Sequence, residues 1–233
     1  MPAVTGQKPG LTGNQLKILA MLAMTCDHVG LQLLPQFDVL RIIGRLSLPI
    51  YAYMIAEGCR YTHSRGKYLL RLAGLALVCQ VVYFGAMGSL YQCILVTFTL
   101  SVCLICAVDN AWKHRDARAV FLALGVSLGT CFVCLMLPML LPQTDFDVDY
   151  GIWGVLLPVL VYFGKTKWRK LALLTLGLVL LAAAYGGVQW WALAAVPLLM
   201  LYSGRRGKYH MGTLFYLYYP LHLVVIYGLS LLF

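Results

Sequence analysis

Apolar segments long enough to cross a lipid bilayer follow one another along the whole chain. A transmembrane helix needs about 20 mainly apolar residues. Only 11% of the residues are charged, whereas a soluble domain carries about 25%. We therefore predict an all-α, polytopic transmembrane helical bundle of about nine spans that forms a single domain over residues 1–233. The predicted spans are residues 14–34, 39–59, 67–88, 91–110, 118–141, 150–164, 169–186, 188–203 and 211–233.

The basic residues gather in alternate loops. All but two of the 18 Lys and Arg residues lie at the N-terminus or in even-numbered loops, and the exceptions are Arg41 and Arg45. Cytoplasmic loops are enriched in Lys and Arg, so we predict a cytoplasmic N-terminus and a multi-pass protein of the bacterial cytoplasmic membrane. The start, MPAVTGQKPG, has no apolar region typical of a cleaved signal peptide. We attribute the net charge of +10 to loops that face anionic lipid rather than nucleic acid.

Eight cysteines are present, and two pairs have CxxC spacing: Cys103 with Cys106, and Cys131 with Cys134. Four thiolates can hold a zinc ion. Both pairs, however, fall within predicted spans, where cysteine commonly serves as a small buried apolar residue. We therefore expect no metal site.

The first two predicted spans carry charges that are costly inside hydrocarbon. Asp27 and His28 lie in the first span, and Arg41 and Arg45 lie in the second. An ionised side chain at the centre of a span costs about 2.5–3.5 kcal/mol on insertion scales. The short turn that contains Pro35 makes the two helices antiparallel neighbours, so positions that sum to about 74 lie at equal depth. Arg45 is then level with His28.

Adjacent residues on a helix point about 100° apart. We therefore expect Asp27 to pair with Arg41, Arg45 or another helix rather than with His28. The same register places Glu57 level with Lys17 in a second polar layer, nearer the cytoplasm.

Lys17 and His28 share one face of the first predicted helix. They are 11 residues apart, which corresponds to about 16 Å along a helix. His28 titrates near neutral pH and is a candidate general base. Two alternatives stay open. The charged residues could form a buried ion-pair network that only holds the bundle together, and Arg41 could extend to the outer headgroups.

Five longer runs of the sequence indicate a protein family more specifically than composition does. They are LKILAMLAMTCDH, RIIGRLSLPIYAYMIAEGCRYTHSRGKYLLRLAGLAL, QCILVTFTL, DVDYGIWGVLL and YLYYPLHLVVIY. In this order they resemble the TraX family, membrane proteins associated with N-terminal acetylation of conjugative pilin. The spacing Lys17-x10-His28 also resembles the basic-x10-His signature of the acyltransferase-3 family. TraX proteins often have an acidic residue after the third apolar run, where this chain has Gln80.

The resemblance implies an enzyme, an O- or N-acetyltransferase that uses acetyl-CoA as the acyl donor. Coenzyme A would enter from the cytoplasm. The acceptor, at the outer side, would be a peptide N-terminus, a glycan or a small amine. His28 would act as general base, Arg45 would stabilise the oxyanion, and Asp27 would balance the arginines. The residues expected to bind coenzyme A are Lys17, Glu57, Arg60, His63, Lys67 and Arg71.

The acceptor is expected to contact Arg41, Asp149, Tyr150, Tyr219 and His222. Asp149 and Tyr150 open the sixth predicted span, and the carboxylate could bind a cationic amine. The alternative is a solvated loop. His222 lies near the middle of the last span, where the alternative is a structural histidine at an aromatic kink.

Two other functions fit part of the pattern. Intramembrane Asp, Glu and His residues are also typical of proton-coupled transporters or exporters. A non-catalytic subunit of a secretion or conjugation complex would use the same charges for folding only.

Overall fold

The computed structural model describes residues 10–208 and 212–232. Lys8 and residues 211 and 233 of the ninth predicted span lie outside these ranges. The described residues form helices and no β-strand, which confirms the all-α prediction. The chain divides into two compact units, Met1–Tyr51 with Gly187–Phe233, and Ala52–Gly186. A single domain over the whole chain stays a prediction.

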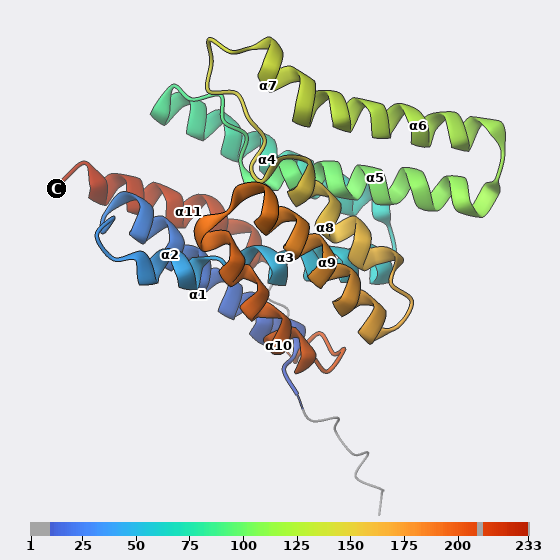
Figure 1. The fold of residues 1–233 in the computed structure, drawn as a ribbon, viewed down its shortest axis with the longest axis horizontal. Helices are drawn as coiled ribbons and strands as arrows, with labels where there is room; N and C mark the ends of the chain where they lie inside the picture. Colours follow the sequence, from blue (N-terminus) through green and yellow to red (C-terminus); the bar gives the residue numbers. More distant parts are fainter. Residues whose placement is uncertain (1–9, 209–211, 233) are drawn as a thin grey trace, which may run out of the picture. The chain divides into compact units, whose positions relative to one another are not determined.

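The first unit contains the helices that carry Asp27 and His28. Its elements are α1 (Gly13–Gln32), α2 (Asp38–Gly44), the 3-10 helix η2 (Gly187–Ala194), α10 (Ala195–Met200) and α11 (Gly212–Ser230). α1 packs on α2 and on α11, and α2 contacts η2 (Figure 1). The predicted antiparallel pair of α1 and α2 is therefore present, although the second predicted span is interrupted directly after Gly44.

The start of α1 is fixed by its own cap. The Thr12 hydroxyl accepts a hydrogen bond from the backbone N–H of Gln15, and the Gln15 side chain accepts one from the Thr12 N–H. This capping box satisfies two backbone donors that the helix itself cannot pair.

The second unit is built around α5. Its elements are α3 (Ser47–Tyr61, of which residues 47–51 belong to the first unit), α4 (Arg65–Met87), α5 (Ile94–His114), α6 (Ala117–Cys131), the π-helix η1 (Phe132–Met136), α7 (Leu137–Leu140), α8 (Gly151–Phe163) and α9 (Lys167–Tyr185). α5 packs on α4, α6 and α8, and α8 packs on α9 (Figure 1). Val102, Ile105, Val155 and Leu157 are fully buried there.

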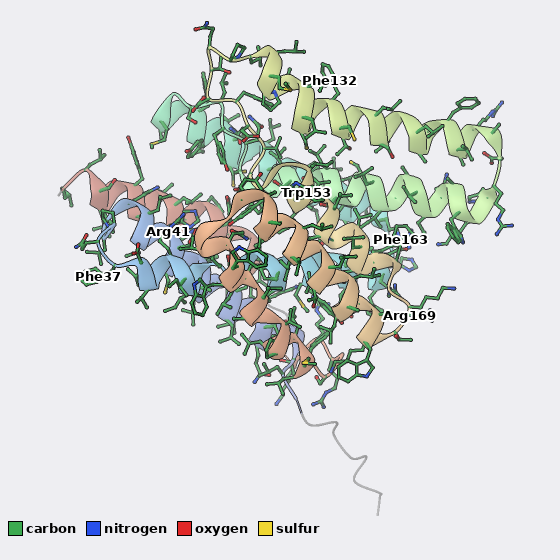
Figure 2. The ribbon with its side chains drawn as sticks, in the orientation of Figure 1. Phe37, Arg41, Phe132, Trp153, Phe163 and Arg169 are labelled. Atoms are coloured by element: carbon green, nitrogen blue, oxygen red, sulfur yellow. The ribbon has the colours of Figure 1, made fainter. Side chains whose placement is uncertain are left out.

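The π-helix begins at Phe132, which is labelled in Figure 2 and is about half exposed. Pro138 lies just after the end of this π-helix and has no backbone N–H to donate. The regular α-helical hydrogen-bond pattern is therefore interrupted at this point, and α6, η1 and α7 still form one continuous helical stretch.

Within the described residues, five helical stretches are long and apolar enough to cross a membrane. They are Asp38–Tyr61, Arg65–Met87, Ile94–His114, Ala117–Leu140 and Lys167–Tyr185. Shorter apolar helices cover Gly151–Phe163, Gly187–Met200 and Leu217–Ser230. These helices support the assignment of the chain to the membrane proteins. The count of nine spans and the cytoplasmic N-terminus stay predictions.

Candidate functional site

Asp27 on α1 lies between two guanidinium groups. Its Oδ2 is 3.0 Å from Nη1 of Arg41, and its Oδ1 accepts a hydrogen bond from Nη2 of Arg45. Arg41 is labelled on α2 in Figure 2, and Arg45 follows the end of that helix. The predicted pairing of Asp27 with these arginines is confirmed. Two cations around one carboxylate leave a net positive charge on the cluster.

Arg45 connects the cluster to the 3-10 helix η2. Its Nη1 donates to Oε1 of Gln189 over 3.2 Å, and its Nε donates to the carbonyl of Arg41 over 3.4 Å. A guanidinium group has no acceptor, so Gln189 must present its oxygen to Arg45. Nε2 of Gln189 is then directed elsewhere, and this buried donor has no hydrogen-bond partner among the described residues.

His28 has a defined tautomer. Its Nδ1 is 2.9 Å from the carbonyl oxygen of Met24. Because a carbonyl only accepts hydrogen bonds, the proton of neutral His28 lies on Nδ1. Nε2 therefore carries the lone pair. Within residues 10–208 and 212–232, this nitrogen forms no hydrogen bond.

His222 on α11 lies against His28. Nε2 of His222 is 3.4 Å from Nδ1 of His28, and the two ring centroids are 5.0 Å apart. Nδ1 of His222 is 3.0 Å from the carbonyl oxygen of Tyr218 and therefore also carries its proton. Nε2 of His222 is left to accept, so the Nδ1–H of His28 is shared between His222 and Met24. The structure thus brings together two histidines from opposite ends of the sequence.

Aromatic and hydroxyl groups hold this pair in place. The Tyr218 ring stacks on His222 with the centroids 5.2 Å apart, and Tyr219 makes an edge contact at 5.5 Å. The Tyr218 hydroxyl forms a hydrogen bond with the hydroxyl of Thr25 on α1. Thr25 in turn donates to the carbonyl of Met21 over 3.1 Å. Sequence reasoning did not assign Thr25, Tyr218 or Gln189 to the site.

Lys17 lies nearer the start of α1, on the same continuous helix as His28. Its Nζ is 5.1 Å from the centroid of the Phe215 ring on α11. The hairpin register predicted Glu57 level with Lys17. In the structure the ion-pair partner of Glu57 is Lys170 on α9, and both groups are buried in the second unit.

The predicted coenzyme A residues of the second unit fall into two groups. Arg60 donates to the backbone carbonyls of Tyr162 and Gly164 at the end of α8, so this guanidinium is already used within the fold. The side chains of His63, Lys67 and Arg71, by contrast, are exposed around the start of α4. Among the predicted coenzyme A residues of the second unit, these three have side chains that are exposed to solvent.

Asp149 and Tyr150 also lie in the second unit. Oδ1 of Asp149 accepts a hydrogen bond of 2.9 Å from the Tyr91 hydroxyl, and its carbonyl accepts one of 2.8 Å from Thr97. Tyr150 adopts a left-handed backbone conformation (φ 58°) directly before α8, and its ring contacts Tyr185. Asp149 therefore does not lie in a solvated loop. Its hydrogen bonds join the start of α8 to the turn before α5.

The long apolar helices, which carry charged side chains, support assignment to the class of membrane proteins. The family model described as TraX protein matches residues 12–230 of this chain. The chain therefore belongs to the TraX family.

Two relatives are similar to this chain, one over most of its length and one over a short part. A probable fimbrial assembly protein FimC (serogroup H1) of Dichelobacter nodosus is 26% identical over 247 residues, which cover 91% of this chain and 93% of that protein. An uncharacterized protein of Rickettsia prowazekii (strain Madrid E) is 50% identical over 38 residues, covering 16% of this chain and 15% of that protein. No solved structure matches the chain.

Proposed function

We propose that this TraX-family protein is a membrane-embedded acyltransferase. It moves an acetyl group from cytoplasmic coenzyme A to an amine or hydroxyl acceptor at the outer side of the bacterial cytoplasmic membrane. The observation that carries the proposal is the tautomer of His28: Nδ1–H is held by the Met24 carbonyl, so the lone pair is on Nε2. An oriented neutral imidazole beside fixed cations is suited to acid–base catalysis of acyl transfer.

His28 acts first as a base and then as an acid. Its Nε2 removes a proton from the acceptor as the acceptor nitrogen or oxygen attacks the carbonyl carbon of the thioester. The carbon–sulfur bond then breaks, and the proton on Nε2 passes to the departing thiolate of coenzyme A. The new bond is an amide or an ester, and His28 returns to its neutral form.

The attack places negative charge on the thioester oxygen, and two donors are suited to stabilise it. Arg45 is fixed by Asp27 and Gln189. The Nε2 group of Gln189 is a buried donor that is not used by the described residues. Donors that are oriented before the reaction stabilise an oxyanion without reorganisation, and loss of one typically lowers the rate by about 10²–10³-fold.

The relative from Dichelobacter nodosus bears the name of a probable fimbrial assembly protein. This name supports a pilus-related acceptor, and we favour the N-terminal amine of a peptide over a glycan or a small amine. His222 contacts His28, and Tyr219 contacts His222, so these two residues are the ones that we expect to border the acceptor.

The test is release of coenzyme A by purified protein in lipid nanodiscs, with acetyl-CoA and peptides that have a free N-terminus. His28→Ala should lower turnover by about 10²–10⁴-fold, because this is the usual contribution of a general base. The matched control is His114→Ala, since His114 is an exposed histidine at the end of α5. A well-folded His28→Ala protein that turns over near the wild-type rate would exclude the mechanism.

The contact between His28 and His222 also favours a second candidate, a proton-coupled transporter, because adjacent imidazoles can pass a proton. Thermal unfolding with and without acetyl-CoA separates the two functions. An acyltransferase is stabilised by its bound donor, whereas the transporter shows no dependence on acetyl-CoA.

A further inference from the structure

Two side-chain contacts join α1 to α11 within the first unit, where these helices pack together (Figure 1). Thr25 and His28 are three residues apart on α1, so they share one face of that helix. Tyr218 and His222 are four residues apart on α11 and share a face in the same way. Thr25 contacts Tyr218, and His28 contacts His222. The candidate base is therefore held to α11 at two successive helical turns.

The contact between the two hydroxyl groups has a direction. Thr25 donates to the carbonyl oxygen of Met21 over 3.1 Å, whereas the Tyr218 hydroxyl lies 3.5 Å from the same oxygen. Thr25 is thus the better placed donor to Met21, and its oxygen accepts the hydrogen bond of Tyr218. The ring of Tyr218 is almost parallel to that of His222, at 8° with the centroids 5.2 Å apart. Tyr218 therefore holds the ring of His222 against α1.

The contact between the two histidines also has a direction. Nδ1 of each ring faces a carbonyl oxygen of its own helix, at 2.9 Å for His28 and 3.0 Å for His222. Both neutral rings therefore carry their proton on Nδ1. Nε2 of His222 is left with its lone pair and lies 3.4 Å from Nδ1 of His28. Consequently His28 donates this hydrogen bond and His222 accepts it.

In a Ser-His-Asp triad, a carboxylate binds the Nδ1–H of the histidine, fixes its tautomer and stabilises its charged form. Among the described residues, no carboxylate is hydrogen-bonded to His28, and the neighbouring Asp27 is paired with Arg41 and Arg45. The lone pair of His222 occupies the corresponding position. Because hydrogen bonds from a charged donor are the stronger ones, this contact strengthens when His28 takes up a proton.

We propose that His222 is the positioning residue of His28, a role that rests on the proposed acyl transfer. When Nε2 of His28 takes the proton of the acceptor, the ring becomes an imidazolium with an N–H at both nitrogens. Its Nδ1–H donates to Nε2 of His222, which stabilises the positive charge and keeps Nε2 of His28 directed at the acceptor. The proton on Nε2 then passes to the thiolate of coenzyme A, so His222 stays neutral throughout. This role is separate from the expected place of His222 beside the acceptor.

The first measurement tests the hydrogen bond itself and needs neither a variant nor turnover. The wild-type, full-length protein is prepared in lipid nanodiscs with nitrogen-15 in its histidines. Magnetic resonance should detect a coupling across the hydrogen bond, between Nδ1 of His28 and Nε2 of His222. Wild-type protein in which these two nitrogens are not coupled overturns the inference.

The second measurement is coenzyme A release by two variants of His222. Leucine in His222→Leu has no acceptor, whereas Oε1 of glutamine in His222→Gln can accept from His28. His222→Leu should lower kcat by about 10–100-fold and change KM for acetyl-CoA by less than about twofold, because a hydrogen bond to a charged group is lost. His222→Gln should restore kcat to within about threefold of the wild type, because the acceptor is present again.

Leu221→Ala is the matched control, because Leu221 is the exposed neighbour of His222 on α11. Exposed substitutions usually have small effects, so both kinetic constants should stay within about twofold of the wild type. A His222→Leu protein with the kcat of the wild type overturns the positioning role. A His222→Gln protein that is as slow as His222→Leu also overturns it, since a side chain that only fills space predicts that result.

Failure of the proposed function is a different result. It occurs when folded His28→Ala releases coenzyme A at the wild-type rate, and it overturns the acyl transfer and the role of His222 together. Absence of the coupling between the two rings, with His28→Ala still inactive, overturns the role of His222 alone.

Discussion

At the scale of single residues, Gly44 allows α2 to approach the carboxylate of Asp27. A Cβ at this position would overlap the side chain of Asp27. Asp27 must keep its place because it pairs with Arg41 and Arg45 at once. The cluster of Asp27, Arg41 and Arg45 therefore requires a residue without a side chain at position 44.

This contact predicts the effect of Gly44→Ala. Alanine normally stabilises a helix by about 1 kcal/mol relative to glycine. At position 44 the displaced carboxylate should reverse the sign, with a loss of about 1–3 kcal/mol, as for other overpacked sites. Thermal unfolding in detergent measures the change. Gly125→Ala is the control, because nothing lies within 4 Å of a Cβ there, and an equal effect of both substitutions would contradict the account.

At the scale of elements, the side chain of Gln80 on α4 forms hydrogen bonds with the segment that leads into α5. Its Nε2 donates to the carbonyl of Tyr91 over 2.8 Å, and its Oε1 accepts from the N–H of Cys93 over 3.1 Å. An ionised carboxylate could accept but not donate. Gln80 therefore closes the turn with a neutral amide that both donates and accepts.

The loop before α8 is held on the same turn. The N–H of Leu90 donates to Oδ1 of Asp145 over 2.8 Å, and the N–H of Gln92 donates to the carbonyl of Asp147 over 2.7 Å. Hydrogen bonds from the side chain of Ser89 and the N–H of Leu90 lower the pKa of the exposed Asp145 carboxyl group. The ionised form of Asp145 is thus the one that fastens the loop.

The sign of this pKa shift predicts how the loop responds to acid. The pKa of Asp145 is lower in the folded protein than in the unfolded chain. The ionised carboxylate therefore stabilises the loop fully above the unfolded pKa of about 3.9. This stabilisation is lost as the pH falls through the pKa of the folded protein. The amide resonance of Leu90 should therefore titrate with a midpoint below about 3.9. Asp145→Asn should remove this titration. A midpoint at or above the ordinary value would show that the hydrogen bonds do not stabilise the carboxylate.

At the scale of the whole molecule, the distribution of basic residues predicts the topology. Reporter fusions should place residues 60–67, 111–118, 165–170 and 204–209 in the cytoplasm and residues 143–149 outside. The reason is that Lys and Arg are retained on the cytoplasmic side during insertion. An external signal from a fusion at residue 65 would contradict both the topology and the entry of coenzyme A from the cytoplasm.

Local sequence determined the helices and the ion pairs of Asp27. Apolar segments of bilayer length predicted the helical stretches because each is a property of consecutive residues. The turn that contains Pro35 is short, so α1 and α2 were expected to be antiparallel, and Asp27 was expected to meet Arg41, Arg45 or another helix. Both expectations are confirmed.

Tertiary structure alone decided which distant side chains complete each cluster. Gln189 reaches Arg45 from 144 residues away, Tyr218 reaches Thr25 from 193, and Lys170 reaches Glu57 from 113. No periodicity or spacing near these residues marks them, because their partners are set by the packing of η2, α11 and α9. The sequence by itself thus determined the helices and the Asp27 pair, whereas contacts between distant helices decided the rest of the site.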